Sequence, residues 1–515
     1  MSGKNILNLL RQLMAAGSIS GTACERTAEA FLESHLASLP YFQKHPRQCG
    51  FSPVPGDPFG RGAVYGLVRG ASAKTVILIN HHDVVDTACY GSLQPLACDM
   101  DAVTEALKVS AAGAAGADFR SGQWLGGRGS CDMKGGAAAQ LDLLAEYSVQ
   151  PGRGSLLFLS VPDEETFSAG MRHALTVLEE LRAGYGLDYR LAVNCEPNRR
   201  EGGTQVIPCG SVGKLLPVVY IKGKSVHVSD YENGLNPLGI LAALVASTEG
   251  LPGLREDCEG EKTVPPVWMF MRDRKQVYDF SLPDKAAGYC TVQAFARTPQ
   301  EIFDLFRGRL LQAITDFRRL HPAAPDVPVK SFSELLREAG QKNGFAAWQE
   351  AETARLHRLV FEENVSYPDA TLIYIEDLLA FMEHDSPLAV LTFSPPYYPA
   401  VRSEDMGKPY FENIKKALAG VMQVRYEPYF LGVSDCSYCG TAPGVDHKAY
   451  IDNTPLWGSL YSFDEQLLSQ MQIPFMLLGP WGKDLHEATE RVHIKSLTEE
   501  LPRALAAVCS AAWEK

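Results

Sequence analysis

The predicted fold rests on a pattern that is clearest in the stretch Thr75-Val-Ile-Leu-Ile-Asn-His-His-Asp83, where a short run of strand-forming residues ends abruptly in a polar cluster. Three later stretches repeat this pattern: Ser155–Glu165, Leu191–Pro197 and Ile473–Gly482. Continuous apolar runs of this length are typical of strands that are buried on both faces of a sheet. We therefore predict a buried strand at each of these places, followed directly by polar residues.

Helical stretches separate the first three runs along the chain. Residues 135–149, rich in alanine and leucine, and residues 169–182 have helical spacing. Because buried strands that alternate with helices are typical of parallel sheets, we predict an α/β fold with a mostly parallel sheet sandwiched by helices. Such sheets bind ligands just beyond the carboxyl ends of their strands. The polar clusters fall at that edge, so we expect the functional site there.

Residues 214–320 follow a different order. The pattern predicts a strand over 215–228, a helix over 236–248, two strands within 267–295 and a helix over 299–320. This order fits a small α+β domain inserted into a larger one. We therefore predict a catalytic domain made of residues 1–213 and 326–515, interrupted by an inserted domain at 214–325. A helical insertion of unassigned role is expected at about residues 331–384.

Composition and charge exclude several classes of protein. Of the 515 residues 46% are hydrophobic and 21% charged, which excludes a disordered, fibrous or disulfide-scaffolded chain. The net charge of −13 disfavours nucleic-acid binding, which needs a basic face. No apolar run approaches the ~20 residues of a membrane span, and the first residues do not resemble a secretory signal. We expect the cysteines, Cys436 and Cys439 included, to be reduced thiols in a cytoplasmic protein.

The polar clusters supply one candidate metal ligand each. These side chains are His81, Asp132, Glu165, Glu196 and His486. Alone, each motif also fits an ordinary polar turn, loop or helix start. With Asp132 as a shared bridge, however, each of two cations receives one histidine, one terminal carboxylate and one bridging oxygen. Three protein ligands for each ion leave positions for water, as in catalytic metal sites.

Two neighbouring carboxylates fit supporting roles. Asp83 can accept the second ring N–H of His81 and so fix the orientation of the imidazole. Because adjacent side chains of an extended chain point opposite ways, Glu165 can bind metal while Glu164 faces the substrate as a general base. The glycine-rich turn 126–136 also suits a phosphate, but it matches neither the Walker spacing nor GxGxxG.

The order HxD, GRGxxDMKGG, DEE, EP and a late histidine resembles the dinuclear-zinc metallohydrolases that include aminoacylase, glutamate carboxypeptidase and succinyl-diaminopimelate desuccinylase. The resemblance implies a zinc-exopeptidase-like fold whose inserted domain is a lid or a homodimer interface. By position it implies the five metal ligands above, the roles of Asp83 and Glu164, and a cis peptide bond after Asp132. Gly223-Lys-Ser-Val-His227 resembles the lid motif of the family, which implies that His227 helps to hold the oxyanion, usually in the site of the partner subunit.

A finer resemblance is to the RocB-like branch of the family, which is linked to arginine utilisation. It is carried by the tracts at residues 210–214, 394–399, 432–438 and 479–484. Candidate substrate-binding groups in or near these tracts are Lys214, Asp435, Tyr438, Lys483 and Arg491.

We therefore expect a cytoplasmic metallopeptidase or amidohydrolase that cleaves an amide or peptide bond of a dipeptide or of an N-acyl or N-carbamoyl amino acid. Two divalent cations, Zn²⁺ first and Mn²⁺ or Co²⁺ as alternatives, would activate a bridging water whose proton Glu164 accepts. Two alternatives stay open: a non-catalytic metal- or ligand-binding relative, and a cysteine hydrolase acting through Cys131 or Cys195. The substrate, the native metal and the oligomeric state are not predicted.

Overall fold

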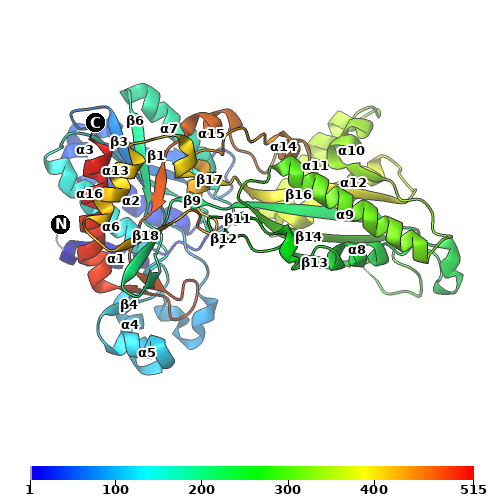
Figure 1. Ribbon diagram of the computed structural model, residues 1–515, viewed down its shortest axis with the longest axis horizontal. Helices are drawn as coiled ribbons and strands as arrows, with labels where there is room; N and C mark the ends of the chain where they lie inside the picture. The colour runs from blue at the N-terminus through cyan, green and yellow to red at the C-terminus, as the bar shows by residue number, and fades with distance from the viewer. Residues whose placement is uncertain (1–2, 276, 515) are drawn as a thin grey trace. The chain divides into compact units, whose positions relative to one another are not determined.

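The computed structural model describes residues 3–275 and 277–514 and consists of two compact units (Figure 1). Unit 1 comprises Met1–Ser211, Val401–Thr441 and Phe463–Lys515, and unit 2 comprises Val212–Ala400 and Ala442–Ser462. Each unit is built on its own central sheet, of six strands in unit 1 and five in unit 2.

The sheet of unit 1 has the strand order β1-β2-β5-β3-β6-β19. Its strands are β1 (Cys49–Pro53), β2 (Gly62–Val68), β3 (Lys74–His81), β5 (Ser155–Val161), β6 (Asp188–Asn194) and β19 (Phe475–Leu477). The four strands expected from the apolar runs, β3, β5, β6 and β19, are mutually parallel. Only the edge formed by β1 and β2 is antiparallel, so the sheet is mixed but mostly parallel, as predicted.

Both faces of this sheet are covered. Consecutive residues of β3 point to opposite faces, yet Val76, Ile77, Leu78 and Ile79 are all fully buried. Helices α6 and α16 contact β3, α6 also contacts β2 and β5, and α7 contacts β2 and β5 as well. Figure 1 shows α6 and α16 in a group with α1 and α13. The continuous burial explains why these strands read as unbroken apolar runs in the sequence.

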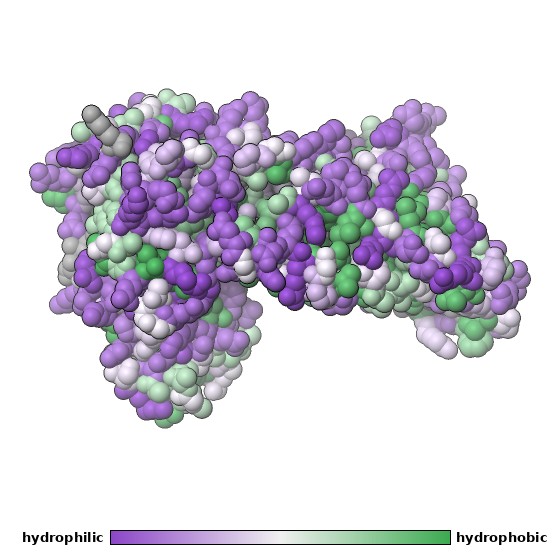
Figure 2. All heavy atoms as spheres, in the orientation of Figure 1, coloured by the Kyte–Doolittle hydropathy of each residue, from purple (hydrophilic) through white to green (hydrophobic). Residues whose placement is uncertain are grey.

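The sequence correctly predicts the two helices between the strands, α6 and α7. Unit 1 contains the helices α1 (Gly3–Ala15), α2 (Glu25–Ser38), α3 (Pro40–Lys44), α4 (Met100–Ser110), α5 (Gly113–Arg120), α6 (Lys134–Val149), α7 (Ala169–Tyr185), α13 (Phe411–Ala419), α15 (Glu465–Met471) and α16 (Leu501–Ala512). Figure 2 shows that hydrophilic side chains dominate the visible surface of this unit. The apolar residues of these helices therefore mainly serve the core.

Small sheets of unit 1 hold its loops in place. Strands β20 (Gly482–Lys483), β21 (Arg491–His493) and β4 (Trp124–Gly126) form one of them, in that order. The others are formed by β7 (Arg200–Glu201), β8 (Thr204–Pro208) and β18 (Val424–Glu427), and by β9 (Gly210–Ser211) and β17 (Val401–Arg402).

Unit 2 has a sheet of order β13-β14-β10-β16-β15, which is antiparallel except for the β15–β16 pair. Its strands are β10 (Gly213–Lys222), β13 (Val267–Asp273), β14 (Lys285–Ala294), β15 (Val329–Ser331) and β16 (Leu388–Tyr398), with a separate pair β11 (Asp257–Cys258) and β12 (Glu261–Lys262). Its helices are α8 (Pro237–Ala246), α9 (Pro299–Leu320), α10 (Phe332–Ala339), α11 (Phe345–Phe361), α12 (Tyr367–Phe381) and α14 (Lys448–Asp452). The β-α-β-β-α order expected for residues 214–320 is present.

Two details differ from the sequence-based expectations. Strand β10 ends at Lys222 and not at residue 228, because its pairing with β14 and β16 stops there and the next paired residue, Lys224, forms a bridge to Leu235. The chain approaches Leu235 closely, since a Cβ atom on Gly223 would lie 2.4 Å from the Leu235 carbonyl oxygen. The compact units also divide the chain differently from the predicted boundary at 325. Since β16 pairs with β10 from Leu388 to Tyr398, residues 326–400 group with unit 2, together with 442–462.

Within the described ranges, no helix has the length and apolar character that crossing a membrane requires.

Candidate metal centre

Three of the predicted ligands lie at the carboxyl ends of neighbouring strands in unit 1. His81 is the last residue of β3, while Glu165 and Glu196 follow β5 and β6. Because β3 lies between β5 and β6 and runs parallel to both, the three strand ends are adjacent. The edge that parallel sheets use for ligands therefore carries two carboxylates and an imidazole.

Loops bring the other two ligands to this edge. Asp132 lies in the glycine-rich turn between β4 and α6, and His486 lies in the loop between β20 and β21. Strand β21 pairs with β4, with Arg491 opposite Gly126, and this pairing places the two loops side by side. A predicted ligand more than 350 residues from Asp132 in the sequence thus reaches the same site.

The five side chains form two donor groups that share Asp132. In one group His81 Nε2 lies 3.3 Å from Asp132 Oδ1 and 3.6 Å from Glu196 Oε1. In the other, His486 Nε2 lies 3.2 Å from Asp132 Oδ2 and 3.1 Å from Glu165 Oε2. Each group has its donor atoms within 4.8 Å of one another. Because the two oxygens of Asp132 face different histidines, the carboxylate has the geometry of a bridge.

The donor set fits two divalent cations. His81 Nε2 is buried and has no hydrogen-bond partner within the described part of the chain. Burial, helped by the charges of Asp132 and Glu165, raises the pKa of Glu196 to about 7, although His81 opposes this shift. Cations between these groups would bond the free nitrogen and offset the mutual repulsion of the carboxylates. Mixed nitrogen and oxygen donors suit Zn²⁺, Mn²⁺ or Co²⁺.

Asp83 organises more of the site than the sequence suggests. Its Oδ1 lies 3.4 Å from His81 Nδ1, which also lies 3.0 Å from the Asp83 carbonyl oxygen. The same carboxylate accepts hydrogen bonds from the backbone N–H groups of Glu164, at 3.2 Å, and Glu165, at 3.1 Å. Although burial raises it, hydrogen bonding to His81 lowers the pKa of Asp83 to about 2. One charged carboxylate therefore orients a histidine and fixes the turn that carries two glutamates.

The turn after β5 has a second anchor in Asp163. This residue has a positive φ of 72°, and its carboxylate accepts hydrogen bonds from Thr166 Oγ1 at 2.6 Å and from the Ala169 N–H at 3.1 Å. Buried Arg61 donates to Asp163 Oδ1 at 2.8 Å and to Glu25 Oε1 at 2.6 Å. The backbone beside Glu164 is thus held by a buried ion-pair network.

The side chain of Glu164 lies among other charged groups. Burial and the negative charges of Glu196, Asp435 and Glu165 raise its pKa well above the ordinary value, although His81 opposes the shift. A carboxylate with an increased proton affinity suits an acid–base role.

Sequence reasoning missed two residues that hold the loops of the site together, Arg128 and Glu490. Arg128 Nη1 donates to Glu490 Oε2 at 2.5 Å, and Arg128 Nη2 donates to the His486 carbonyl oxygen at 2.9 Å. Glu490 Oε1 accepts the backbone N–H groups of Cys131, at 3.3 Å, and Asp132, at 3.4 Å. The pair therefore joins the bridging residue to the His486 loop. An arginine between two glycines of the GRG motif was the available signal.

The backbone around Asp132 needs small residues and an unusual bond. The peptide bond Asp132–Met133 is cis, as the family resemblance implies. A Cβ atom on Gly136 would lie 2.3 Å from the Cys195 carbonyl oxygen, and one on Gly135 would lie 2.5 Å from that of Ser130. Gly136 therefore lets the start of α6 pass directly against the end of β6, and Gly135 leaves room for the turn at Ser130.

Comparison with known proteins now identifies the family, since the model described as "Peptidase family M20/M25/M40" matches residues 96–512. The chain belongs to this family. It is 31% identical over 532 residues to the uncharacterised protein YqjN of Bacillus subtilis (strain 168), covering 98% of this chain and 96% of that protein. It is also 27% identical over 519 residues to protein RocB of the same strain, covering 94% and 91%.

Solved structures of the M20 fold align over the full length. Aminopeptidase PepT from Bacillus cereus ATCC 10987 covers 100% of both chains with a TM-score of 0.55 at 11% identity. The M20 family metallo-carboxypeptidase Sso-CP2 from Sulfolobus solfataricus covers 98% of this chain and 99% of its own, with a TM-score of 0.54 at 13% identity. The predicted fold and family are thus confirmed, and the chain is an enzyme of this peptidase family.

The two cysteines proposed as nucleophiles are unsuited to catalysis in this M20 chain. Cys131 and Cys195 are completely buried, and burial raises the pKa of both thiols far above the ordinary value. Because the thiolate is the reactive form, the cysteine-hydrolase alternative loses its chemical basis. Cys436 and Cys439 are buried free thiols, as expected.

Of the other predicted residues of the M20 chain, two belong to unit 2 and two are engaged in ion pairs in unit 1. His227 and Lys214 belong to unit 2, where His227 Nδ1 lies 2.7 Å from Ser229 Oγ. In unit 1, Lys483 Nζ lies 2.9 Å and Arg491 Nη2 2.8 Å from Asp118 Oδ2. The positively charged side chains of Lys483 and Arg491 are therefore paired with a carboxylate of the protein itself.

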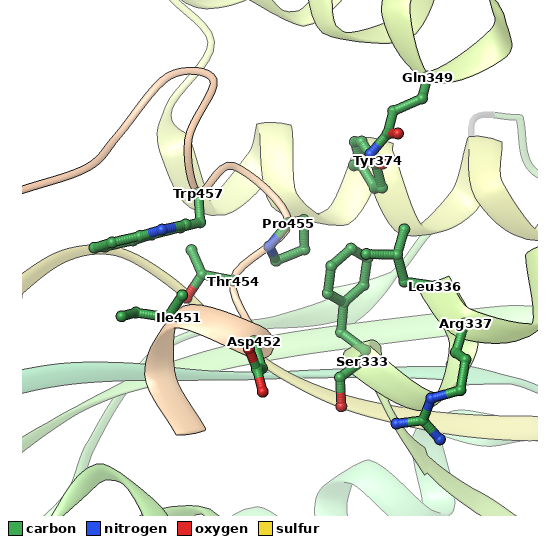
Figure 3. A pocket seen from close by; sticks show the side chains of 11 residues that line it. Ser333, Leu336, Arg337, Gln349, Tyr374, Ile451, Asp452, Thr454, Pro455 and Trp457 are labelled. Carbon is green, nitrogen blue, oxygen red and sulfur yellow. The ribbon is translucent and has the colours of Figure 1, made fainter. Parts of the chain in front are cut away.

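Unit 2 of the M20 chain contains a separate cavity of about 460 Å³ (Figure 3). Helices α10, α11, α12 and α14 and the segment after α14 line it. Its walls include aromatic rings such as Tyr374 and Trp457, and its charged lining residues are Arg337 and Asp452. Since neither donor group contributes to it, this cavity is not the candidate metal centre.

Proposed function

We propose that this M20 chain is a metal-dependent hydrolase that cleaves an amide or peptide bond of a small substrate, either a dipeptide or an N-acyl or N-carbamoyl amino acid. The observation that carries the proposal is the pair of donor groups sharing Asp132, together with the adjacent carboxylate of Glu164, whose pKa is raised well above the ordinary value. Two metals around one carboxylate and an adjacent acid–base group are sufficient parts for hydrolysis of an unactivated amide.

We propose the following ligand assignment. His81 and Glu196 would hold one divalent cation, Glu165 and His486 would hold the other, and Asp132 would contribute to both. Zn²⁺ is the proposed native metal, with Mn²⁺ or Co²⁺ as alternatives. When bound, such cations supply Lewis-acid polarisation of the carbonyl and a lower pKa for a coordinated water.

The other residues of the site move protons and hold positions. Glu164 accepts the proton of the attacking water and then gives it to the leaving amine, so one carboxylate serves both half-steps. Asp83 keeps the His81 ring in place and holds the Glu164 backbone through its N–H. His227 is proposed to donate a hydrogen bond to the oxyanion of the tetrahedral intermediate.

Small substrates are proposed partly on the names of similar structures. These include an aminopeptidase, a tripeptidase and a metallo-carboxypeptidase, which share the fold with this chain. Arginine utilisation in the cytoplasm remains a proposal, based on the resemblance to RocB and on free cysteines.

The inserted unit is proposed to be a lid or a homodimer interface. Its strand β13 is a sheet edge, and the exposed side chains on and near it include Met269 (63% exposed), Phe280 (59%) and Tyr278 (87%). A free edge with apolar side chains is a ready surface for a second copy of the chain. Sedimentation of the wild type and of Met269→Glu distinguishes the roles, because an interface variant becomes monomeric.

The decisive experiment measures metal content and turnover in the same preparations. We expect two equivalents of metal per wild-type chain and turnover of at least one dipeptide or acyl amino acid, abolished by a strong chelator. Glu164→Gln should keep both metals and lose turnover. The control is Glu180→Gln, which changes an exposed glutamate of α7 and should keep both metals and full turnover. Turnover by a fully loaded Glu164→Gln enzyme would exclude Glu164 as the base. Metal binding without turnover of any substrate would favour the non-catalytic alternative.

A further inference from the structure

A short 3₁₀ turn, η6 (Asp435–Tyr438), lies beside the candidate metal centre in unit 1. Its N-terminal cap is Ser434, whose Oγ accepts hydrogen bonds from the Cys436 N–H at 3.2 Å and from Asn194 Nδ2 at 3.1 Å. The same amide nitrogen of Asn194 lies 3.4 Å from Glu196 Oε1. One asparagine thus ties the turn to a proposed metal ligand.

Asp435 begins this turn and is a buried carboxylate without a partner. The residue is 1% exposed, and neither of its oxygens has a hydrogen bond within the described part of the chain. Burial, with the charges of Asp83 and Glu196, raises the pKa of Asp435 to about 7, although His81 and the Ser168 hydroxyl favour the charged form.

Two other buried carboxylates of unit 1, Asp163 and Glu490, are well bound. Asp163 accepts hydrogen bonds from Arg61 and Thr166, and Glu490 accepts them from Arg128 and two backbone amides. A buried charge that lacks such partners is costly to keep, so it normally serves a ligand or a reaction. Asp435 also belongs to neither donor group around Asp132, so it does not have the position of a metal ligand.

The charge of the loaded site points to the kind of ligand. Six carboxylates surround it: Asp83, Asp132, Glu164, Glu165, Glu196 and Asp435. Two divalent cations offset four of these six charges. The nearby guanidinium groups of Arg61 and Arg128 are already paired with Asp163 and Glu490. A negative charge therefore remains, and a positively charged substrate group would neutralise it at the unpartnered Asp435.

We infer that Asp435 is a specificity-determining residue that binds a cationic nitrogen of the substrate, an ammonium or a guanidinium. This inference rests on the proposed hydrolase function and narrows its substrate class. The cation has two chemical sources: the free α-ammonium group of a dipeptide, or the basic side chain of an N-acyl amino acid. Both would place one charge-assisted hydrogen bond on a buried carboxylate, where water competes least.

The test measures ligand binding by calorimetry to metal-loaded Glu164→Gln enzyme, which should not consume its ligands. In each of two pairs of probes, one member carries a positively charged nitrogen that the other lacks. N-acetyl-L-lysine against N-acetyl-L-norleucine tests a side-chain cation, and L-alanyl-L-alanine against its N-acetyl derivative tests the α-ammonium group. We expect the cationic member of one pair to bind at least about 10-fold more tightly, which is about 1.4 kcal/mol. Adding Asp435→Asn should remove that preference while metal content stays at two equivalents.

A matched control is Asp142→Asn in the same background. Asp142 also has a buried oxygen without a partner, but it lies eight residues, or about 12 Å of helix rise, beyond the start of α6. Asp142→Asn should leave the preference for the cationic probe unchanged. If Asp435→Asn does not fold, Asp435→Ser, which removes the charge with a smaller side chain, replaces it.

Three results would overturn the inference: no preference in either pair, a preference that survives at Asp435→Asn, or loss of metal from that variant, which would make Asp435 a ligand. Failure of the parent proposal looks different. A wild-type enzyme that turns over neutral substrates without preference refutes only the role of Asp435. A loaded enzyme without any turnover, yet with Asp435-dependent binding of a cation, refutes only the hydrolase.

Discussion

Glu490→Gln should weaken metal binding although Glu490 touches no proposed metal position. The carboxylate is fully buried, pairs with Arg128 at 2.5 Å and accepts the N–H groups of Cys131 and Asp132. Glutamine keeps an oxygen for the two amides but removes the charge that faces Arg128. Breaking a buried ion pair from one side typically costs about 3–5 kcal/mol of stability.

The effect on the metals follows from what the pair holds. Arg128 also donates to the His486 carbonyl oxygen, so a displaced guanidinium moves the loop of one ligand and the turn of the bridge. Loss of such supporting contacts typically weakens metal binding about 10–100-fold, or about 1.4–2.8 kcal/mol. Competition with a fluorescent Zn²⁺ chelator at pH 8 measures the affinity, and thermal unfolding with and without metal measures the stability.

Two further variants separate positioning from stability. Glu500→Gln breaks a half-buried ion pair with Arg200, 2.6 Å long, and should change metal affinity by less than about 2-fold. Replacing both partners in Arg128→Met/Glu490→Gln should recover part of the stability, because no charge stays unpaired. It should not recover affinity, since the contact with the His486 loop is still missing. Wild-type affinity in Glu490→Gln would refute the reasoning.

Two further predictions concern stability. Asp163→Ala should destabilise unit 1 by about 3 kcal/mol because it removes one carboxylate partner of buried Arg61. Asp163→Asn should lose less stability, because asparagine tolerates the positive φ of 72° at this position. Urea denaturation measures the stability of both variants, and equal losses would contradict this prediction. Burial lowers the pKa of His447 in unit 2 to about 4, so the unfolded chain binds its proton first as the pH falls below about 6.5. The free energy of unfolding should therefore decrease as the pH is lowered from about 6.5 to 4, by about 2 kcal/mol at pH 5. In urea denaturation at a series of pH values, His447→Gln should make the free energy of unfolding less dependent on pH in this range. An unchanged pH dependence in the variant would contradict the prediction.

Much of unit 1 was predictable because burial on both faces leaves a plain signal. Runs such as Thr75–Ile79 are apolar at successive positions, and helical stretches between them define a parallel sheet. The predicted ligands followed from the same signal, since they come directly after strand ends or in glycine-rich turns. The helix at Pro299–Leu320 was predictable from its spacing and from Thr298 and Glu301, which form a capping box.

What the sequence did not reveal depends on contacts between distant segments. Pairing of β16 with β10 moves residues 326–400 into unit 2, and no local pattern encodes which strand is the neighbour. The pairing of Arg128 with Glu490 likewise spans 362 residues. Asp83 could be recognised as a partner of His81, but its hydrogen bonds to the Glu164 and Glu165 amides depend on the register of two strands. Such side chains look like ordinary polar residues until the fold is known.

Equilibrium dialysis with Zn²⁺ on ligand variants gives the sharpest check of a pair of cations bridged by Asp132. The wild type should bind two equivalents, Glu165→Gln/His486→Ala one, and Asp132→Ala close to none, because only Asp132 belongs to both donor groups. Retention of two equivalents by Asp132→Ala, in a variant that is folded by circular dichroism, would contradict the bridged centre and the hydrolysis proposed to depend on it.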